Sequence, residues 1–281
     1  MNVRRKLVIT RLTGQVKSSA FTLRRVLFIA YLMSRIMAEI DIAKALQTVR
    51  SKISAASKPQ QRLQPRLVAV SKTKPKELII AAYREGQRHF GENYIQELIE
   101  KSNNQEILRE CPDIKWHFIG RVQSNKVPKL VSVPNLYVVE TLDSEKLAAA
   151  LNRGWSQRNN PTPLNVMIQV NTSGEVQKGG VEPSETASLA QYVVKECASL
   201  KFLGIMTIGM ASYDPSTGPN PDFVNLVKCR DAMCEKLGLD SGDIELSMGM
   251  SADYVHAIEL GSTNVRVGST IFGQRDYTAK K

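Results

Sequence analysis

Short apolar runs alternate along the chain with longer segments in which apolar residues recur at helical spacing. The short runs predict strands that are buried on both faces, and the longer segments predict helices. This alternation is typical of βα units that build a parallel sheet. The expected strands are Leu67–Ser71, Arg88–Phe90, Lys115–Ile119, Leu136–Val139, Asn165–Val170, Phe202–Met206, Ile244–Ser247 and Asn264–Val267.

Helices are expected between these strands, and a further one opens at Met37. Pro75 and Pro183 stand near the starts of two of them, where proline costs no helical hydrogen bond. Eight strands with intervening helices over residues 37–281 favour a single α/β domain, a closed (β/α)8 barrel of the TIM type. An open sheet more often has about five to seven strands. The predicted helices include Pro75–Glu85, Tyr94–Lys101, Ser144–Asn152, Pro183–Ala198, Pro221–Leu237 and Asp253–Leu260.

A lysine, Lys72, stands at the end of the first expected strand, just before a helix. Because barrel enzymes place their sites at the carboxyl ends of the strands, this side chain is expected to project into the barrel mouth. Partial desolvation and neighbouring cations favour the free amine, the form that attacks an aldehyde to make a Schiff base. The alternative is a solvated lysine at a strand end. Lys74 is the rival amine, but it is expected to lie outside the strand.

Small and hydroxyl-bearing residues follow the last two expected strands. Gly268, Ser269 and Thr270 come directly after the eighth strand, and a second such turn lies within Leu246–Asp253. Two adjacent turns of this kind can cup one phosphate, which barrels commonly bind after strands seven and eight. Taken alone, Gly-Ser-Thr is equally a helix N-cap. A catalytic serine is the competing idea, but Met-Gly-Met-Ser does not match the G-x-S-x-G elbow.

Three further polar residues are candidates for the same end of the barrel. Arg266 lies two residues before Gly268 and therefore faces the same side of its strand. It is either a cation that faces a bound ligand or an arginine in a structural salt bridge. Asn93 follows the second strand, and His117, within the third, is more typical of a packed barrel interior than of a general base. The chain contains no Walker A, G-x-G-x-x-G or zinc-binding pattern.

The formal net charge of +11 is concentrated at the amino end. Residues 1–36 hold eight basic residues and no acidic one, which leaves +3 for residues 37–281. We expect residues 1–36 to be a disordered extension with one of three origins: an organelle-targeting segment, an arm that binds a membrane surface or nucleic acid, or upstream sequence translated from a wrongly chosen start codon. The barrel itself is not expected to bind nucleic acid.

Cysteine usage and hydropathy bear on the location of the protein. Four cysteines are scattered without a Cys-x-x-Cys pair, and none has metal-ligand spacing to any of the three histidines. We therefore expect free thiols and a cytoplasmic location, unless residues 1–36 direct the chain to an organelle. No apolar run reaches the roughly 18 residues that a bilayer-spanning helix needs, so no membrane span is expected.

Several short motifs occur together, in order, between about residues 38 and 273. In combination they closely resemble the pyridoxal phosphate homeostasis proteins, which are single-domain relatives of the barrel half of alanine racemase. The departure from that pattern is mainly in residues 1–36. The motifs are Val70-Ser71-Lys72-Thr73, Phe90-Gly91-Glu92-Asn93, His117-Phe118-Ile119-Gly120, Gln123-Ser124-Asn125-Lys126, Gln169-Val170-Asn171, Lys178-Gly179-Gly180, Gly204-Ile205-Met206-Thr207, Leu246–Asp253 and Val265-Arg266-Val267-Gly268.

The resemblance implies that pyridoxal 5'-phosphate (PLP) is bound covalently, as an internal aldimine of Lys72. It also implies that Arg266 faces the pyridine nitrogen. A permanent cation there would keep that nitrogen unprotonated and weaken the cofactor as an electron sink. The other cofactor-binding residues implied by the resemblance are Ser251, Gly268 and Ser269 around the phosphate, with Ser247 and Asn93 close to the cofactor.

The same resemblance implies a role in intracellular PLP homeostasis, in which the chain holds PLP and delivers it to apo-enzymes without established catalytic turnover. We expect a monomer. The alternative is an enzyme, either a PLP-dependent amino-acid racemase or a lysine Schiff-base aldolase. Racemisation needs an acid or base on each face of the bound amino acid, and alanine racemase takes its second group from another domain and subunit. Lys72 has no evident partner base, so we expect a carrier rather than an enzyme.

Overall fold

Eight parallel strands close into a barrel in the computed structural model, which describes residues 37, 39–158, 161–210 and 213–274. The strands are β1 (Arg66–Val70), β2 (His89–Glu92), β3 (Lys115–Phe118), β4 (Leu136–Leu142), β5 (Leu164–Gln169), β6 (Leu200–Met206), β7 (Glu245–Met250) and β8 (Asn264–Val267). Each strand pairs with the next one along the chain, and β8 pairs in parallel with β1 to complete the closure. The predicted (β/α)8 barrel is therefore confirmed.

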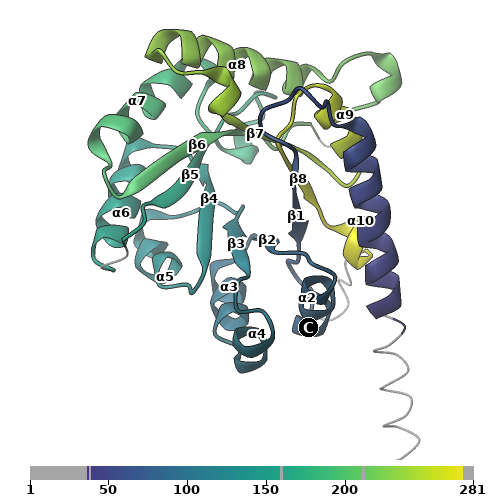
Figure 1. Ribbon diagram of the computed structural model, residues 1–281. Helices are drawn as coiled ribbons and strands as arrows, with labels where there is room; N and C mark the ends of the chain where they lie inside the picture. Colours follow the sequence, from purple (N-terminus) through teal and green to yellow (C-terminus); the bar gives the residue numbers. More distant parts are fainter. Residues whose placement is uncertain (1–36, 38, 159–160, 211–212, 275–281) are drawn as a thin grey trace, which may run out of the picture.

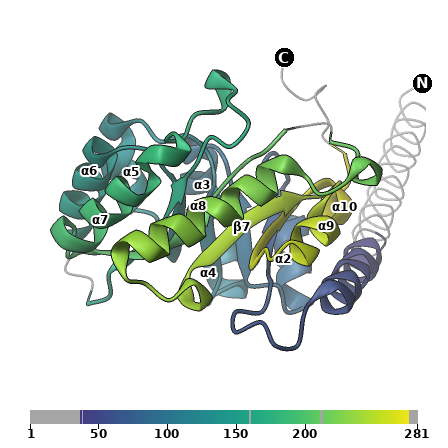
Figure 2. The same ribbon diagram turned by 90° about the horizontal axis from the view of Figure 1, so that it is seen from above.

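Helices surround the barrel (Figure 1). They are α2 (Lys76–Arg84), α3 (Ile95–Ser102), α4 (Gln105–Glu110), α5 (Val127–Val131), α6 (Glu145–Ser156), α7 (Thr186–Glu196), α8 (Pro221–Leu237), α9 (Tyr254–Glu259) and α10 (Ser269–Phe272). A helix over residues 39–56 precedes β1 and lies beside α9 and α10, as both Figure 1 and Figure 2 show. The helices α4 and α5 are not predicted from the sequence because they are too short for a helical period to stand out.

Side chains along each strand alternate between two environments, as the pleat requires. In β8, Val265 and Val267 belong to the large apolar core, most of which lies between the strands and the helices. Asn264 and Arg266 point the other way and form hydrogen bonds inside the barrel. The barrel interior therefore combines polar side chains with a small apolar cluster. This cluster consists of Val138, Met167 and Met206.

Most strand boundaries differ by one to three residues from those expected, and two of these differences affect the site. β1 ends at Val70, so Lys72 lies in the turn after the strand rather than at the strand end. β7 continues to Met250, so Ser247 lies within a strand and the hydroxyl-bearing turn begins only at Ser251. The candidate ligand-binding residues are thus divided between a strand and the turns that follow the strands.

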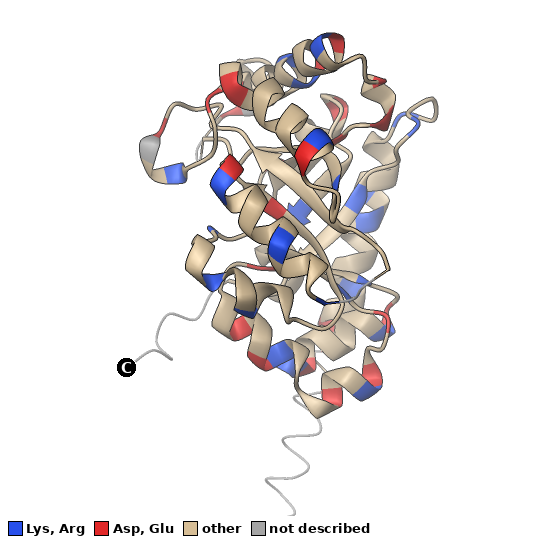
Figure 3. Ribbon diagram, turned by 90° about the vertical axis from the view of Figure 1, so that its left-hand side faces the viewer, with Lys and Arg blue, Asp and Glu red and all other residues tan. Residues whose placement is uncertain are grey.

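Charged residues of both signs are interspersed along the outer helices (Figure 3). Within the described part of the chain, the four cysteines are free thiols, as expected, and no group of His, Cys, Asp and Glu residues is arranged to hold a metal ion. None of the described helices is both long and apolar enough to cross a membrane. The basic residues 1–36 lie outside the described residues, so their role stays a prediction.

Candidate functional site

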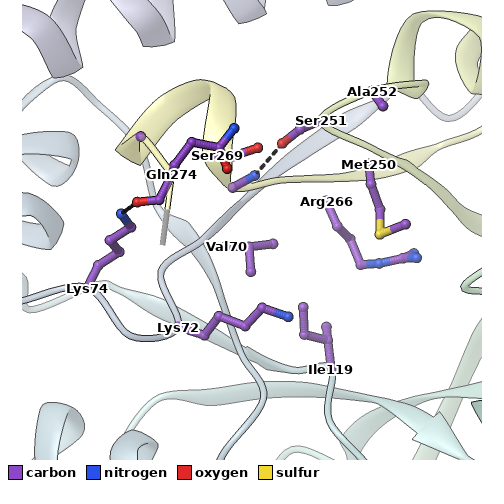
Figure 4. Close-up of a pocket in the computed structure, with 12 residues that line it drawn as sticks. Val70, Lys72, Lys74, Ile119, Met250, Ser251, Ala252, Arg266, Ser269 and Gln274 are labelled. Atoms are coloured by element: carbon purple, nitrogen blue, oxygen red, sulfur yellow. Dashed lines mark hydrogen bonds between the residues drawn. The ribbon is translucent and has the colours of Figure 1, made fainter. Parts of the chain in front are cut away.

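A cavity of about 350 Å³ lies at the carboxyl ends of β1, β7 and β8. This is the end of the barrel at which the fold presents its binding loops. Lining residues that the sequence predicted are Lys72, Ser251, Arg266, Gly268 and Ser269. Figure 4 shows Lys72, Ser251, Arg266 and Ser269 around this cavity. The remaining lining residues are Val70, Lys74, Ile119, Met250, Ala252, Gly273 and Gln274.

The turn after β1 brings two lysines to this cavity (Figure 4). The Lys72 side chain extends toward Ile119 and Arg266. Lys74 points in another direction and donates a hydrogen bond from Nζ to the backbone carbonyl of Gln274, at 2.7 Å. The geometry therefore favours Lys72 over Lys74 as the amine that meets a ligand beside the guanidinium.

Two short turns form another wall of the cavity. Ser251 Oγ accepts a hydrogen bond from the backbone N–H of Gly268 (3.1 Å) and one from that of Thr270 (3.5 Å), so the turns after β7 and β8 adjoin as predicted. A Cβ at position 268 would lie 3.2 Å from the backbone carbonyl oxygen of Val70, so glycine allows this turn to pack closely against β1. The hydroxyls of Ser251 and Ser269 face this cavity beside the backbone of both turns, where Ser251 Oγ takes up the N–H groups of Gly268 and Thr270, and hydroxyl donors of this kind suit an anion.

Arg266 is buried, and its guanidinium is fixed from inside the barrel. It donates one hydrogen bond to Ser247 Oγ (2.6 Å) and another to the backbone carbonyl of Thr207 (2.8 Å). The Ser247 hydroxyl donates in turn to Glu140 (2.6 Å). Ser247 is fully buried and does not line the cavity, and its expected place close to the cofactor stays a prediction. Because β7 continues past it, its side chain holds Arg266.

A chain of buried polar side chains continues from Ser247 across the barrel. Glu140 accepts further hydrogen bonds from His117 Nδ1 (2.5 Å) and Asn264 Nδ2 (3.1 Å). The Nε2 atom of His117 lies 2.8 Å from Nδ1 of His89. With Glu140 ionised, His117 donates at Nδ1 and accepts at Nε2, so both imidazoles are neutral. His117 is therefore a barrel-interior residue, as expected.

Burial and hydrogen bonding set the ionisation of this chain. Burial by itself raises the pKa of Glu140, but the hydrogen bond from His117, the charge of Arg266 and the hydrogen bond from Ser247 outweigh it and bring the pKa to about 2. Burial lowers the pKa of His117, and the contact with Glu140 offsets only part of this lowering. Burial, followed by nearby positive charges, lowers the pKa of His89 to about 2. Glu140 thus stays negatively charged, and Ser247 lies between it and Arg266.

Asn93 does not line the cavity that contains Lys72. It lines a neighbouring one of about 380 Å³, together with Arg121 and Lys126. β2 ends at Glu92, and the chain then turns toward α3, which takes Asn93 away from the lysine. The buried Oδ1 of Asn93 has no hydrogen-bond partner among the described residues. The expectation that Asn93 lies close to the cofactor stays a prediction.

Sequence reasoning misses the acidic partner of the site, Glu140. The available signal is a single carboxylate inside the apolar stretch that forms β4, since a charged residue in such a strand is rarely buried without partners. It also misses Ile119, Met250 and Gln274, which line the cavity. The directions of these three side chains depend on where the strands end and how the loops turn, and the spacing of apolar residues in the sequence specifies neither.

The fold and the cavity define a class of protein that comparison with known proteins identifies. Residues 45–276 match the family model of the alanine racemase N-terminal domain. The alanine racemase of Corynebacterium glutamicum has a similar fold, with a TM-score of 0.60 at 14% identity over 86% of this chain and 63% of that chain. The protein is therefore a barrel of the alanine racemase N-terminal class.

More similar relatives identify the family within this class. The pyridoxal phosphate homeostasis protein of Homo sapiens is 52% identical over 247 residues, covering 86% of this chain and 90% of that protein. The protein of the same name from Schizosaccharomyces pombe is 46% identical over 234 residues, covering 83% and 93%. PipY of Synechococcus elongatus, in its structure with PLP bound, has a TM-score of 0.68 at 30% identity over 83% of this chain and 100% of that one. The chain belongs to the pyridoxal phosphate homeostasis protein family, as its motifs predict.

Acidification is expected to destabilise the barrel through its neutral histidines. The folded protein lowers the pKa of His89 and of His117 below the ordinary value of 6.5, so the unfolded chain binds more protons below that pH. The contribution of each neutral histidine to the free energy of unfolding is fully present above about pH 6.5. Below that pH it falls by at most about 1.4 kcal/mol per pH unit. Urea unfolding at neutral pH and at about pH 5 measures the loss. Between these two pH values, His89→Gln is expected to lose less free energy of unfolding than wild type does. Equal losses in the two proteins would contradict a neutral His89.

Proposed function

We propose that this chain binds PLP through a covalent bond to Lys72 and serves intracellular PLP homeostasis by carrying the cofactor to apo-enzymes. One observation carries the proposal: Lys72, Arg266 and the adjoining turns at Ser251 and Gly268 line a single cavity. The relatives named pyridoxal phosphate homeostasis protein and the PLP-bound structure of PipY support the identity of the ligand.

The groups around the cavity match the functional groups of PLP. Backbone N–H groups and hydroxyls at Ser251, Gly268 and Ser269 suit the phosphate, which accepts hydrogen bonds and carries negative charge. Arg266 suits an unprotonated pyridine nitrogen, because a guanidinium can only donate. Lys72 supplies the amine for the aldehyde. The volume of about 350 Å³ is within the usual range for a small-molecule site.

PLP supplies an electrophilic aldehyde, and Lys72 supplies the nucleophile. Lys72 would hold the cofactor by condensation of its neutral amine with that aldehyde, which forms a carbon–nitrogen double bond and releases one water. Ile119 lies beside the amine in Figure 4, and its apolar side chain would keep that side of the amine from being hydrated.

The same lining supports binding rather than turnover. Among the described residues around the cavity, none is a carboxylate, a histidine or a tyrosine. Racemisation requires a second proton-transfer group, and Lys74, the other amine in the lining, donates to the carbonyl of Gln274. Arg266 keeps its proton, so a ring nitrogen that faces it stays unprotonated and the cofactor is a weak electron sink. We therefore propose a carrier without catalytic turnover.

Replacement of the two lysines tests the covalent bond. In Lys72→Ala the visible absorbance of the Schiff base is expected to disappear, while weak binding through the phosphate turns persists. In Lys74→Ala the absorbance is expected to remain, because Lys72 still extends toward Arg266. Absorbance spectra with added PLP, recorded before and after borohydride, give the result. If Lys72→Ala formed a reducible adduct at wild-type occupancy, the assignment of Lys72 as the covalent residue would be wrong.

Replacement of Ser251 tests the phosphate wall. Ser251→Ala removes a hydroxyl that joins the two turns, and a hydrogen bond to a charged group contributes about 1.5–3 kcal/mol. The affinity for PLP is therefore expected to fall about 10- to 100-fold in equilibrium dialysis, with the adduct still forming at saturating PLP. Thr270→Val is the matched control, because Thr270 does not line the cavity. Equal losses of affinity in the two variants would contradict the assignment of Ser251.

An assay of amino-acid racemisation tests the absence of turnover. We expect the PLP-loaded protein to leave the stereochemistry of a panel of L-amino acids unchanged, as measured by chiral chromatography with alanine racemase as a positive control. The physical reason is that the described residues of the lining include no paired acid and base. Racemisation above background that disappears in Lys72→Ala would show instead that the protein is an enzyme.

A further inference from the structure

The turn that carries Lys72 has a conformation that its sequence does not favour. Residues 71–74 form a turn closed by a hydrogen bond from the Lys74 N–H to the Ser71 carbonyl, at 3.0 Å. Thr73 has a φ of 62°, in the left-handed region that glycine and asparagine usually occupy at this position of a turn. A β-branched residue there is strained, so the turn depends on contacts from the rest of the fold.

Three charged side chains supply those contacts. Lys101 Nζ, from α3, donates to the backbone carbonyl of Ser71 at 2.7 Å. It also donates to the carboxylates of Glu92 and Glu97, each at 2.7 Å. Glu97 Oε1 accepts a hydrogen bond from the backbone N–H of Thr73 (2.6 Å), and Ser71 Oγ donates to Glu92 (2.7 Å). The residues immediately before and after the reactive lysine are therefore both held.

The contacts of Lys101 with Ser71 and Glu92 are buried, whereas the hydrogen bond from the Thr73 N–H to Glu97 is exposed. The side chain of Lys101 is 10% exposed and that of Glu92 is 0% exposed. All three donors of the Lys101 ammonium are used, which leaves it one arrangement. None of the three charged residues lines the cavity, so their effect on a ligand is indirect.

We propose that Lys101, Glu92 and Glu97 form a clamp that holds the 71–74 turn in the strained conformation that directs Lys72 into the cavity. They are positioning residues for Schiff-base formation and contact no part of the cofactor. Without the clamp, Thr73 relaxes out of the left-handed region and the lysine no longer meets the aldehyde. This inference rests on the proposed role of Lys72 as the covalent residue.

Variants of Glu97 test the clamp, because this side chain is 23% exposed and its loss leaves the buried Lys101–Glu92 pair in place. Glu97→Ala removes the acceptor for the Thr73 N–H, and Glu97→Gln keeps an oxygen that can accept the same bond. After mixing with PLP, the visible absorbance of Glu97→Ala is expected to rise about tenfold more slowly than that of wild type. The reason is that Thr73 then relaxes from its strained conformation, so that fewer molecules direct Lys72 into the cavity. Glu97→Gln is expected to react at nearly the wild-type rate.

Two further measurements separate positioning from general damage. Pyridoxine 5'-phosphate lacks the aldehyde, so its affinity is expected to be the same for wild type and Glu97→Ala. Thr73→Gly introduced into Glu97→Ala is expected to restore the rate, because glycine adopts a positive φ without strain. Arg66→Met breaks a partly buried ion pair with Glu245 and serves as a control that lowers Tm without slowing the reaction.

The outcomes distinguish this inference from the proposed function. If wild type forms no reducible adduct, the proposed function fails and the clamp has no role in it. If wild type forms the adduct and Glu97→Ala forms it equally fast, the clamp alone is wrong. A loss of pyridoxine 5'-phosphate affinity in Glu97→Ala equal to its loss of rate would also overturn the clamp, because it would show that the whole cavity is damaged.

Discussion

The pairing of β8 with β1 is the contact on which the whole site depends. Its register sets Val68 opposite Arg266 and Ala69 opposite Val267, so the carboxyl ends of the first and last strands lie side by side. The turn that carries Lys72 therefore meets the turn at Gly268, although almost the whole barrel separates them in sequence. In an open sheet these two strands would be free to lie at opposite edges, and the amine and the anion-binding turns would have no reason to share a cavity.

A second constraint is the burial of a cation beneath that cavity. A guanidinium inside a barrel is costly unless it is hydrogen-bonded and a negative charge lies near. Ser247 and the Thr207 carbonyl provide the hydrogen bonds for Arg266, and Glu140 provides the charge behind the serine. The neutral His117 and its neighbours complete the hydrogen bonding of that carboxylate. Polar side chains thus occupy positions inside the barrel that apolar ones could fill, and they fix the direction of the Arg266 guanidinium. A guanidinium with a fixed direction is suited to face one particular atom of a ligand.

Local sequence pattern was sufficient for the barrel but only partly for the site. Buried strands have a clear period, and Lys72 and Gly268 each follow a strand closely enough that the closed fold brings them together. Nothing in the pattern shows that β7 continues past Ser247, so its hydrogen bond with Arg266 is not anticipated. The loop direction that takes Asn93 to the neighbouring cavity is not periodic either. Glu140 is not recognised because its partners lie on strands far away in sequence. The clamp beneath the lysine turn is missed for the same reason, since a buried ion pair is defined by tertiary contacts rather than by spacing.

The central claim is that one lysine of this cavity bonds to PLP. Its most direct test is to incubate the wild-type protein with PLP, reduce it with borohydride and map its peptides by mass spectrometry. We expect one pyridoxyl group per chain, on the peptide that contains Lys72, with trypsin failing to cleave at that residue. A label on Lys74, or a label distributed over several surface lysines, would contradict the claim.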